Sequence, residues 1–171
     1  MTTCPLKKHP VLSAVRHNHA LEHATLHVLS QRFPGVKMAG VSIPQGFFLF
    51  ADLPTEIVTD GVLEAQRRLE AGEKALAIHP NCGTNLVTSA SLAGALAWAV
   101  LFGTSFGRKP RWFNYILAVS AAVPVFLFSK PLGLKVQENL TTDGNLEGLK
   151  VRLVTSQKTQ NSFFHRISTG Q

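Results

Sequence analysis

The chain has 171 residues, of which 45% are hydrophobic, and a formal net charge of +7. This length suits one compact unit and is too short for two full domains. The excess positive charge lies mainly around residues 103–111 and after residue 129, on either side of apolar sequence. It does not form the dense basic stripe of a nucleic-acid binder, so we expect no nucleic-acid partner. Two cysteines, Cys4 and Cys82, are too few for a disulfide framework.

The segment from residue 17 to residue 27 places four histidines and a glutamate in eleven residues. Alanine, leucine and glutamate favour helix, and no glycine or proline interrupts Val11–Phe33. At about 100° per residue, His19 and His23 lie on one stripe of this predicted helix, and Glu22 lies beside them.

This spacing indicates metal chemistry, because two imidazoles one helical turn apart reach a single divalent ion. An adjacent carboxylate, here Glu22, would serve a metal-bound water as a base. The order His-x-x-Glu-His is the inverted-zincin signature. His27 is about 12 Å along the axis from His19 at ~1.5 Å per residue, so it cannot join the same ion and other ligands must come from elsewhere. The alternative is an amphipathic helix whose histidines bond carbonyls or carboxylates, or face water.

Two apolar segments, Leu86–Phe102 and Trp112–Phe128, contain no charged residue. Each has 17 residues. With uncharged neighbours each can span about 18 to 20 residues, near the lower limit for crossing a hydrocarbon core. Trp112 and Tyr115 resemble an interfacial aromatic anchor, and small residues in both segments would let two helices approach closely. We expect a transmembrane hairpin; the alternative is a helical hairpin buried in a soluble protein.

The orientation of this hairpin is indicated by two conflicting observations. Arg108, Lys109 and Arg111 in the connecting loop would place that loop in the cytoplasm by the positive-inside rule. No signal peptide is evident in the first ten residues, which places the polar domain in the cytoplasm instead. We adopt the second interpretation, a multi-pass protein with two spans whose partners are the lipid bilayer and other membrane proteins.

The remaining chain predicts short strands and one further helix. The helix begins at Pro54 and ends at Gly72. Strands are expected at Val36–Ile43, Phe47–Ala51, Ala75–Ile78, Leu149–Val154 and Phe163–Ile167, the last two joined by a loop at Thr155–Asn161. The predicted fold class is α+β: a small mixed domain built from residues 1–84 and 130–171, interrupted by a two-helix transmembrane hairpin at residues 85–129.

A second polar cluster, His79–Asn85, lies where the predicted Ala75–Ile78 strand meets the apolar hairpin. His79 or Cys82 would complete a metal site begun by His19 and His23. Imidazole and thiolate ligands suit zinc, iron or copper, so the metal is not determined by them. The alternative role is structural, because an Asn or Thr in this segment would cap the helix that follows.

Three motifs carry a resemblance to a known family: the run His17–Thr25, the pair Gly46-Phe47, and the run His79–Leu86 ahead of an apolar hairpin. Over most of its length the chain resembles an uncharacterised family of small bacterial membrane proteins common in photosynthetic bacteria, and this resemblance implies no activity.

A local likeness, through His19, Glu22 and His23, is to the inverted-zincin (insulinase-type) peptidases. It implies zinc on the two histidines, a catalytic Glu22 and a downstream glutamate as third ligand. At the comparable distance this chain is apolar, around Trp98, and Glu138 is the nearest acidic candidate after the hairpin.

Two functions follow as hypotheses. The first is an integral membrane protein with a histidine-based metal site, acting as a non-catalytic membrane subunit or assembly factor. The second is a membrane-anchored zinc-dependent hydrolase or peptidase that uses Glu22. In both, His19, His23, His79 and Cys82 are the candidate metal ligands, and the cofactor is zinc or another divalent transition metal. A bis-histidine haem site is a lesser variant, since no haem-attachment motif is present.

Overall fold

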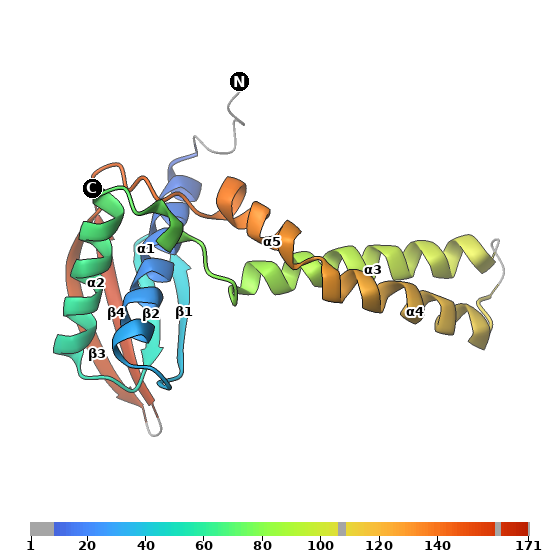
Figure 1. Ribbon diagram of the computed structural model, residues 1–171, viewed down its shortest axis with the longest axis horizontal. Helices are drawn as coiled ribbons and strands as arrows, with labels where there is room; N and C mark the ends of the chain where they lie inside the picture. Colours follow the sequence, from blue (N-terminus) through green and yellow to red (C-terminus); the bar gives the residue numbers. More distant parts are fainter. Residues whose placement is uncertain (1–8, 106–108, 160–161, 171) are drawn as a thin grey trace. The chain divides into compact units, whose positions relative to one another are not determined.

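The computed structural model describes residues 9–105, 109–159 and 162–170 (Figure 1). The chain forms two compact units. The first joins the chain up to His79 with the chain from Glu138 onward, and the second is Pro80–Gln137. The first unit is therefore built from two pieces of chain, between which the second unit is inserted.

Two long helices belong to the first unit. Helix α1 covers Pro10–Arg32 and begins with proline, whose fixed φ angle suits the first helical position. Helix α2 covers Thr55–Glu70, with Glu56 in its first turn and two arginines in its last turn. Charges at these positions interact favourably with the helix dipole and stabilise the helix. Both predicted helices are confirmed.

The sheet of the first unit has four antiparallel strands in the order β1-β2-β4-β3. These strands are β1 (Met38–Ile43), β2 (Gly46–Ala51), β3 (Lys150–Thr159) and β4 (Ser162–Gly170). Since β2 pairs with β4, the sheet joins the N-terminal and C-terminal pieces of the chain. Strands from both pieces of the chain thus meet in one sheet.

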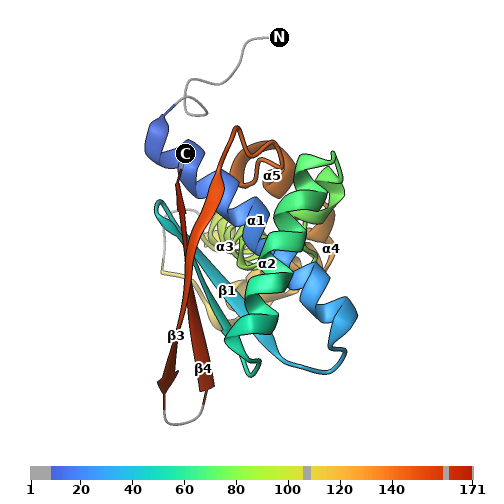
Figure 2. The same ribbon diagram turned by 90° about the vertical axis from the view of Figure 1, so that its left-hand side faces the viewer.

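Helices α1 and α2 lie on one face of this sheet (Figure 2). The buried residues between the layers are apolar and include Leu21 and Leu29 of α1, Val58 and Val62 of α2, and Phe47, Leu49 and Ile167 of the sheet. At Gly46, where β2 starts, a Cβ atom would collide with the main-chain oxygen of Ile167. Glycine is therefore required for the close approach of β2 to β4.

Two local predictions in the first unit are wrong. The expected strand Ala75–Ile78 is instead a 3₁₀ turn, η2 (Lys74–Ala77), which packs against α1. Periodicity does not separate strand from helix in so short an apolar run. The expected loop at Thr155–Asn161 is strand as far as Thr159, because the β3–β4 hairpin continues its pairing there; residues 160–161 lie outside the described residues.

The second unit is helical. It contains α3 (Gly83–Ser105), α4 (Trp112–Phe128) and the short α5 (Lys130–Val136), which leads into a π turn, η3 (Gln137–Thr141). Helices α3 and α4 lie side by side and run in opposite directions (Figure 1). Helix α5 packs on α3 where Gly133 meets Asn85, and the Gln137 side-chain amide donates to the Asn85 amide oxygen at 2.6 Å.

One helix of the described residues is long and apolar enough to cross a membrane, namely Gly83–Thr104 within α3. The predicted second span, α4, has 17 residues and is followed by a bend of 56° into the segment Lys130–Thr141. The predicted two-helix transmembrane hairpin is therefore not shown, because the second segment is a broken helix that counts as a span only if both its parts are taken together. Of the basic loop residues, Arg108 lies outside the described residues.

Candidate metal centre

Three histidines of α1 each bond a main-chain carbonyl. His19 Nδ1 donates to the Thr141 oxygen at 3.0 Å, and His23 Nδ1 donates to the Ala77 oxygen at 2.7 Å. One turn further along, His27 Nε2 donates to the Ile78 oxygen at 2.9 Å. The stripe predicted from the helical period is therefore directed at η2 and at the end of η3.

These hydrogen bonds determine which ring nitrogen carries the proton, because a carbonyl oxygen only accepts. His19 and His23 are protonated on Nδ1, so in the neutral ring the lone pair is on Nε2. The two rings lie next to each other, with centroids 4.3 Å apart. A ligating histidine characteristically donates its other ring N–H to a carbonyl or carboxylate, which orients the ring and makes it a better ligand.

The predicted ligands are divided between the two units. His19 and His23 belong to the first unit, where their rings are neighbours, and Cys82 lies in the second unit, just before α3. Cys82 follows His79 by three residues and is a partly buried, reduced cysteine. The main-chain N–H of Thr84 points at its sulfur at 3.3 Å, a contact that favours a negative charge on Sγ.

His79 lies between two histidines of α1. Its ring centroid is 5.6 Å from that of His23 and 4.9 Å from that of His27. Burial, together with the nearby His23 and His27 rings, lowers the pKa of His79 to about 4. The ring is therefore neutral near pH 7. Of the predicted ligands, His79 thus contacts His23 within the first unit.

Glu22, the predicted base, lies in a different environment from the histidines. Its carboxylate is buried against β1, where it accepts a hydrogen bond from the Ser42 hydroxyl and packs on Gly40. His19 and His23 bond main-chain carbonyls outside α1, whereas Glu22 contacts the sheet. The structure therefore does not show the three side chains directed at one common point. Glu138, the other acidic candidate, is exposed.

Comparison with known proteins identifies the family. A model of the family described as a domain of unknown function (DUF6391) matches residues 14–154. The chain belongs to the DUF6391 family. It is also similar to an uncharacterized protein of Picosynechococcus sp., which is 34% identical over 158 residues, with 77% of this chain and 75% of the relative covered. No solved structure matches.

Membership in DUF6391 confirms the expected uncharacterised family and assigns no activity. The matched range contains all five predicted site residues. The separate likeness to inverted-zincin peptidases has no support from these comparisons.

The structure adds site residues of this DUF6391 chain that the sequence patterns did not identify. The carbonyls of Ala77, Ile78 and Thr141 orient the histidines. Every residue has a main-chain carbonyl, so residue types could not have identified these three. Arg16 holds the segment after Thr141 on α1, since its guanidinium donates to the Thr142 oxygen at 3.1 Å and pairs with Asp143 at 3.3 Å.

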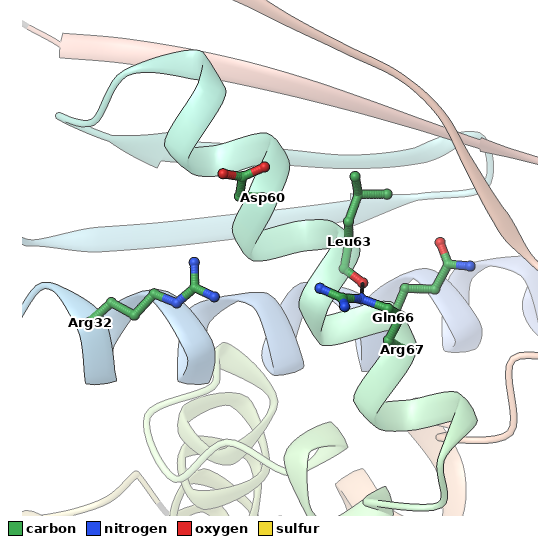
Figure 3. A pocket seen from close by; sticks show the side chains of 5 residues that line it. All are labelled: Arg32, Asp60, Leu63, Gln66 and Arg67. Carbon is green, nitrogen blue, oxygen red and sulfur yellow. Dashed lines mark hydrogen bonds between the residues drawn. The ribbon is translucent and has the colours of Figure 1, made fainter.

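A hollow of about 420 Å³ between α1 and α2 is a separate feature (Figure 3). It is lined by Arg32, Asp60, Leu63, Gln66 and Arg67, none of which is a histidine or a cysteine. Three of these side chains have partners within the fold: Arg32 pairs with Glu64, Gln66 bonds Glu70, and Arg67 donates to the Leu63 main-chain oxygen at 3.4 Å. The candidate metal centre of the DUF6391 chain is thus distinct from this hollow.

Proposed function

We propose that this protein is a membrane-anchored metal-binding protein that acts as a non-catalytic subunit or assembly factor. His19 and His23 hold zinc or another divalent transition metal, and Cys82 is the third ligand that the sequence predicts. The observation that carries the proposal is the pair of neighbouring imidazoles whose Nδ1–H groups are bonded to the carbonyls of Thr141 and Ala77. In each neutral ring the lone pair is therefore on Nε2, the nitrogen that does not bond the carbonyl.

The donor set determines the class of metal. Two neutral imidazoles and one thiolate suit zinc and other borderline or soft transition metals, and they are poor ligands for magnesium or calcium. Three protein ligands leave a fourth tetrahedral position, which a water or a group from a partner protein would fill. A site that a partner completes is consistent with a subunit or an assembly factor.

The contacts of Glu22 favour binding over hydrolysis. A general base must lie within hydrogen-bond reach of the water that it activates. The Glu22 carboxylate is instead engaged by Ser42 and packed against Gly40 in the interface between α1 and the sheet. This geometry supports a structural role for the glutamate of the His-x-x-Glu-His motif.

The surface of the second unit supports attachment to a membrane. Large apolar side chains of α3 and α4 are exposed, with Trp98 at 65% and Phe128 at 81% of their full area. Exposed apolar surface on this scale marks a membrane or protein interaction site. We assign it to lipid, with α3 as a span, and the prediction that the first unit faces the cytoplasm stands as part of this proposal.

The test of the metal site is the metal content of the full chain purified in detergent. We expect about one equivalent of a divalent transition metal in the wild type, and a loss of most of it in His23→Ala and in Cys82→Ser. Cobalt substitution adds a spectroscopic readout, because a thiolate-to-cobalt charge-transfer band should be present in the wild type and absent from Cys82→Ser.

The matched control is His9→Ala, which removes an exposed histidine just before α1 that makes no side-chain cap. This variant should keep the wild-type metal content and the cobalt band. A wild type without bound metal, or a metal content that His23→Ala leaves unchanged, overturns the proposal.

A further inference from the structure

Four histidine rings of the first unit form a continuous chain. The centroid distances are 4.3 Å from His19 to His23, 5.6 Å from His23 to His79, and 4.9 Å from His79 to His27. The proposed function uses only the first two rings. The other two rings, His27 and His79, are neighbours at the opposite end of this row of four rings, and the proposed function does not use them.

The separation of these two rings fits a shared ion. A metal bound about 2.0–2.1 Å from an imidazole nitrogen lies roughly 3 Å from the ring centre, so two rings at a tetrahedral angle have centroids about 5 Å apart. The His27–His79 distance of 4.9 Å agrees with this value, and the two rings are tilted by 56° rather than stacked in parallel.

The protonation of His27 also fits a ligand. Its Nε2–H donates to the Ile78 carbonyl, so the lone pair of the neutral ring is on Nδ1. His19 and His23 have the other tautomer, protonated on Nδ1. In all three residues a main-chain carbonyl orients the ring. Because Ile78 is the residue before His79, this bond also fixes the main chain next to the second ring.

We propose that His27 and His79 form a second position for a divalent transition metal, next to the one held by His19 and His23. Both residues are partly exposed, whereas His23 is 2% exposed. With two protein ligands, the second position binds more weakly than the first and exchanges its ion with solution. Since His79 contacts both His23 and His27, it links the exposed position to the buried one, and the four histidines form a route for metal entry and release.

This inference rests on the proposed function, because the site at His19 and His23 is expected to bind its metal ion before the site at His27 and His79 does. The test is calorimetric titration of the full chain in detergent with Zn²⁺, after removal of metal with a chelator. The wild type should show a tight step and a weaker second step of one equivalent each. His27→Gln keeps a side-chain amide that donates to the Ile78 carbonyl, and it should weaken the second step about tenfold or more while the tight step remains.

The controls separate the two proposals. His79→Gln should act like His27→Gln, whereas His9→Gln should leave both steps unchanged. His23→Ala should lose the tight step and keep the weak one. A single tight step in the wild type, unchanged in His27→Gln, overturns the second position and leaves the first intact. Loss of the weak step in His9→Gln as well also overturns it, because the binding would then not belong to this pair.

A measurement on the unmodified chain guards against variants that fold poorly. In ¹⁵N spectra of the imidazole rings, the second equivalent of Zn²⁺ should shift Nδ1 of His27 and one nitrogen of His79. Shifts confined to His19 and His23 during the second equivalent contradict the proposal.

Discussion

The carboxylate of Glu22 on α1 lies directly over Gly40 of β1, at a point where the strand has no side chain. A Cβ atom at Gly40 would collide with the Glu22 side chain, and the hydroxyl of Ser42, two residues along the same strand, donates to the carboxylate. Glycine at this position lets the helix approach the sheet with an acidic side chain in the interface. This contact orients α1, and with it the histidines on another side of the same helix.

Replacement of this glycine by valine should therefore destabilise the first unit. Gly40→Val forces the Glu22 side chain or the strand to move, and overpacking of this kind costs about 1–3 kcal/mol. The midpoint of chemical or thermal unfolding of the full chain in detergent is the measurement. Ala39→Val is the matched control, because Ala39 is exposed and valine favours strand. Equal midpoints for the two variants would show that the Glu22 contact does not constrain the interface.

Glu22→Gln separates the structural role of this residue from a catalytic one. The amide keeps the size of the carboxylate but weakens a buried hydrogen bond to a charged group, which is worth about 1.5–3 kcal/mol. We expect a lower unfolding midpoint together with unchanged metal content, measured by elemental analysis of the purified protein. A metal-dependent peptidase activity in the wild type that disappears in Glu22→Gln would instead support the hydrolase alternative.

The apolar surface of α3 allows a test of membrane insertion. An arginine at the centre of a membrane-spanning helix costs about 2.5–3.5 kcal/mol on insertion scales. Leu92→Arg, near the middle of α3, should therefore release much of the protein from membranes extracted with alkaline carbonate, whereas the wild type stays in the pellet.

The matched control for this test is Gly103→Arg, near the end of the same helix. A Cβ atom at Gly103 has nothing within 4 Å, and an arginine there reaches the interface. This variant should behave as the wild type does. Extraction of the wild type itself into the soluble fraction would contradict the assignment of α3 as a span.

The periodic features of the sequence predicted much of the fold. The histidine helix, the second helix and the strands of both terminal pieces follow from regular spacing of apolar residues, which is a local signal. The turn η2 and the short helix α5 did not follow, because each is too short for a period to show, and Pro131 and Gly133 lie inside α5. Their conformation depends on packing against α1 and α3, which the sequence alone does not reveal.

The candidate site was predictable to a similar extent. His19 and His23 were identified from residue type and spacing, and the structure places their rings next to each other, each oriented by a main-chain carbonyl. The environment of Glu22 was not predicted. A helical wheel puts Glu22 about 60° from His19, but it does not say which of the two side chains faces the sheet. The contact with Gly40 decides this, and it depends on the register of a strand 18 residues away in sequence.

His165 predicts how the stability of the first unit depends on pH. Its ring is fully buried in β4, where its cross-strand neighbours are Leu49 and Ser156, neither of which carries a charge. Burial lowers the pKa of His165 below its ordinary value of 6.5, although hydrogen bonds with the main chain of Ala51 and Leu53 oppose this. Between the two pKa values the unfolded chain binds more protons than the folded one, so stability falls as the pH is lowered through 6.5.

The change in unfolding free energy should level off once the pH is below the lowered pKa, at about 1.4 kcal/mol for each unit of difference. His165→Leu removes the titrating group, so its stability between neutral and acidic pH should change less than that of the wild type, whatever its stability at pH 8. The measurement is the unfolding midpoint of the metal-free full chain across this pH range. His9→Leu, at an exposed position, should keep the wild-type slope. If His165→Leu keeps that slope too, the acid sensitivity does not come from the buried ring of β4.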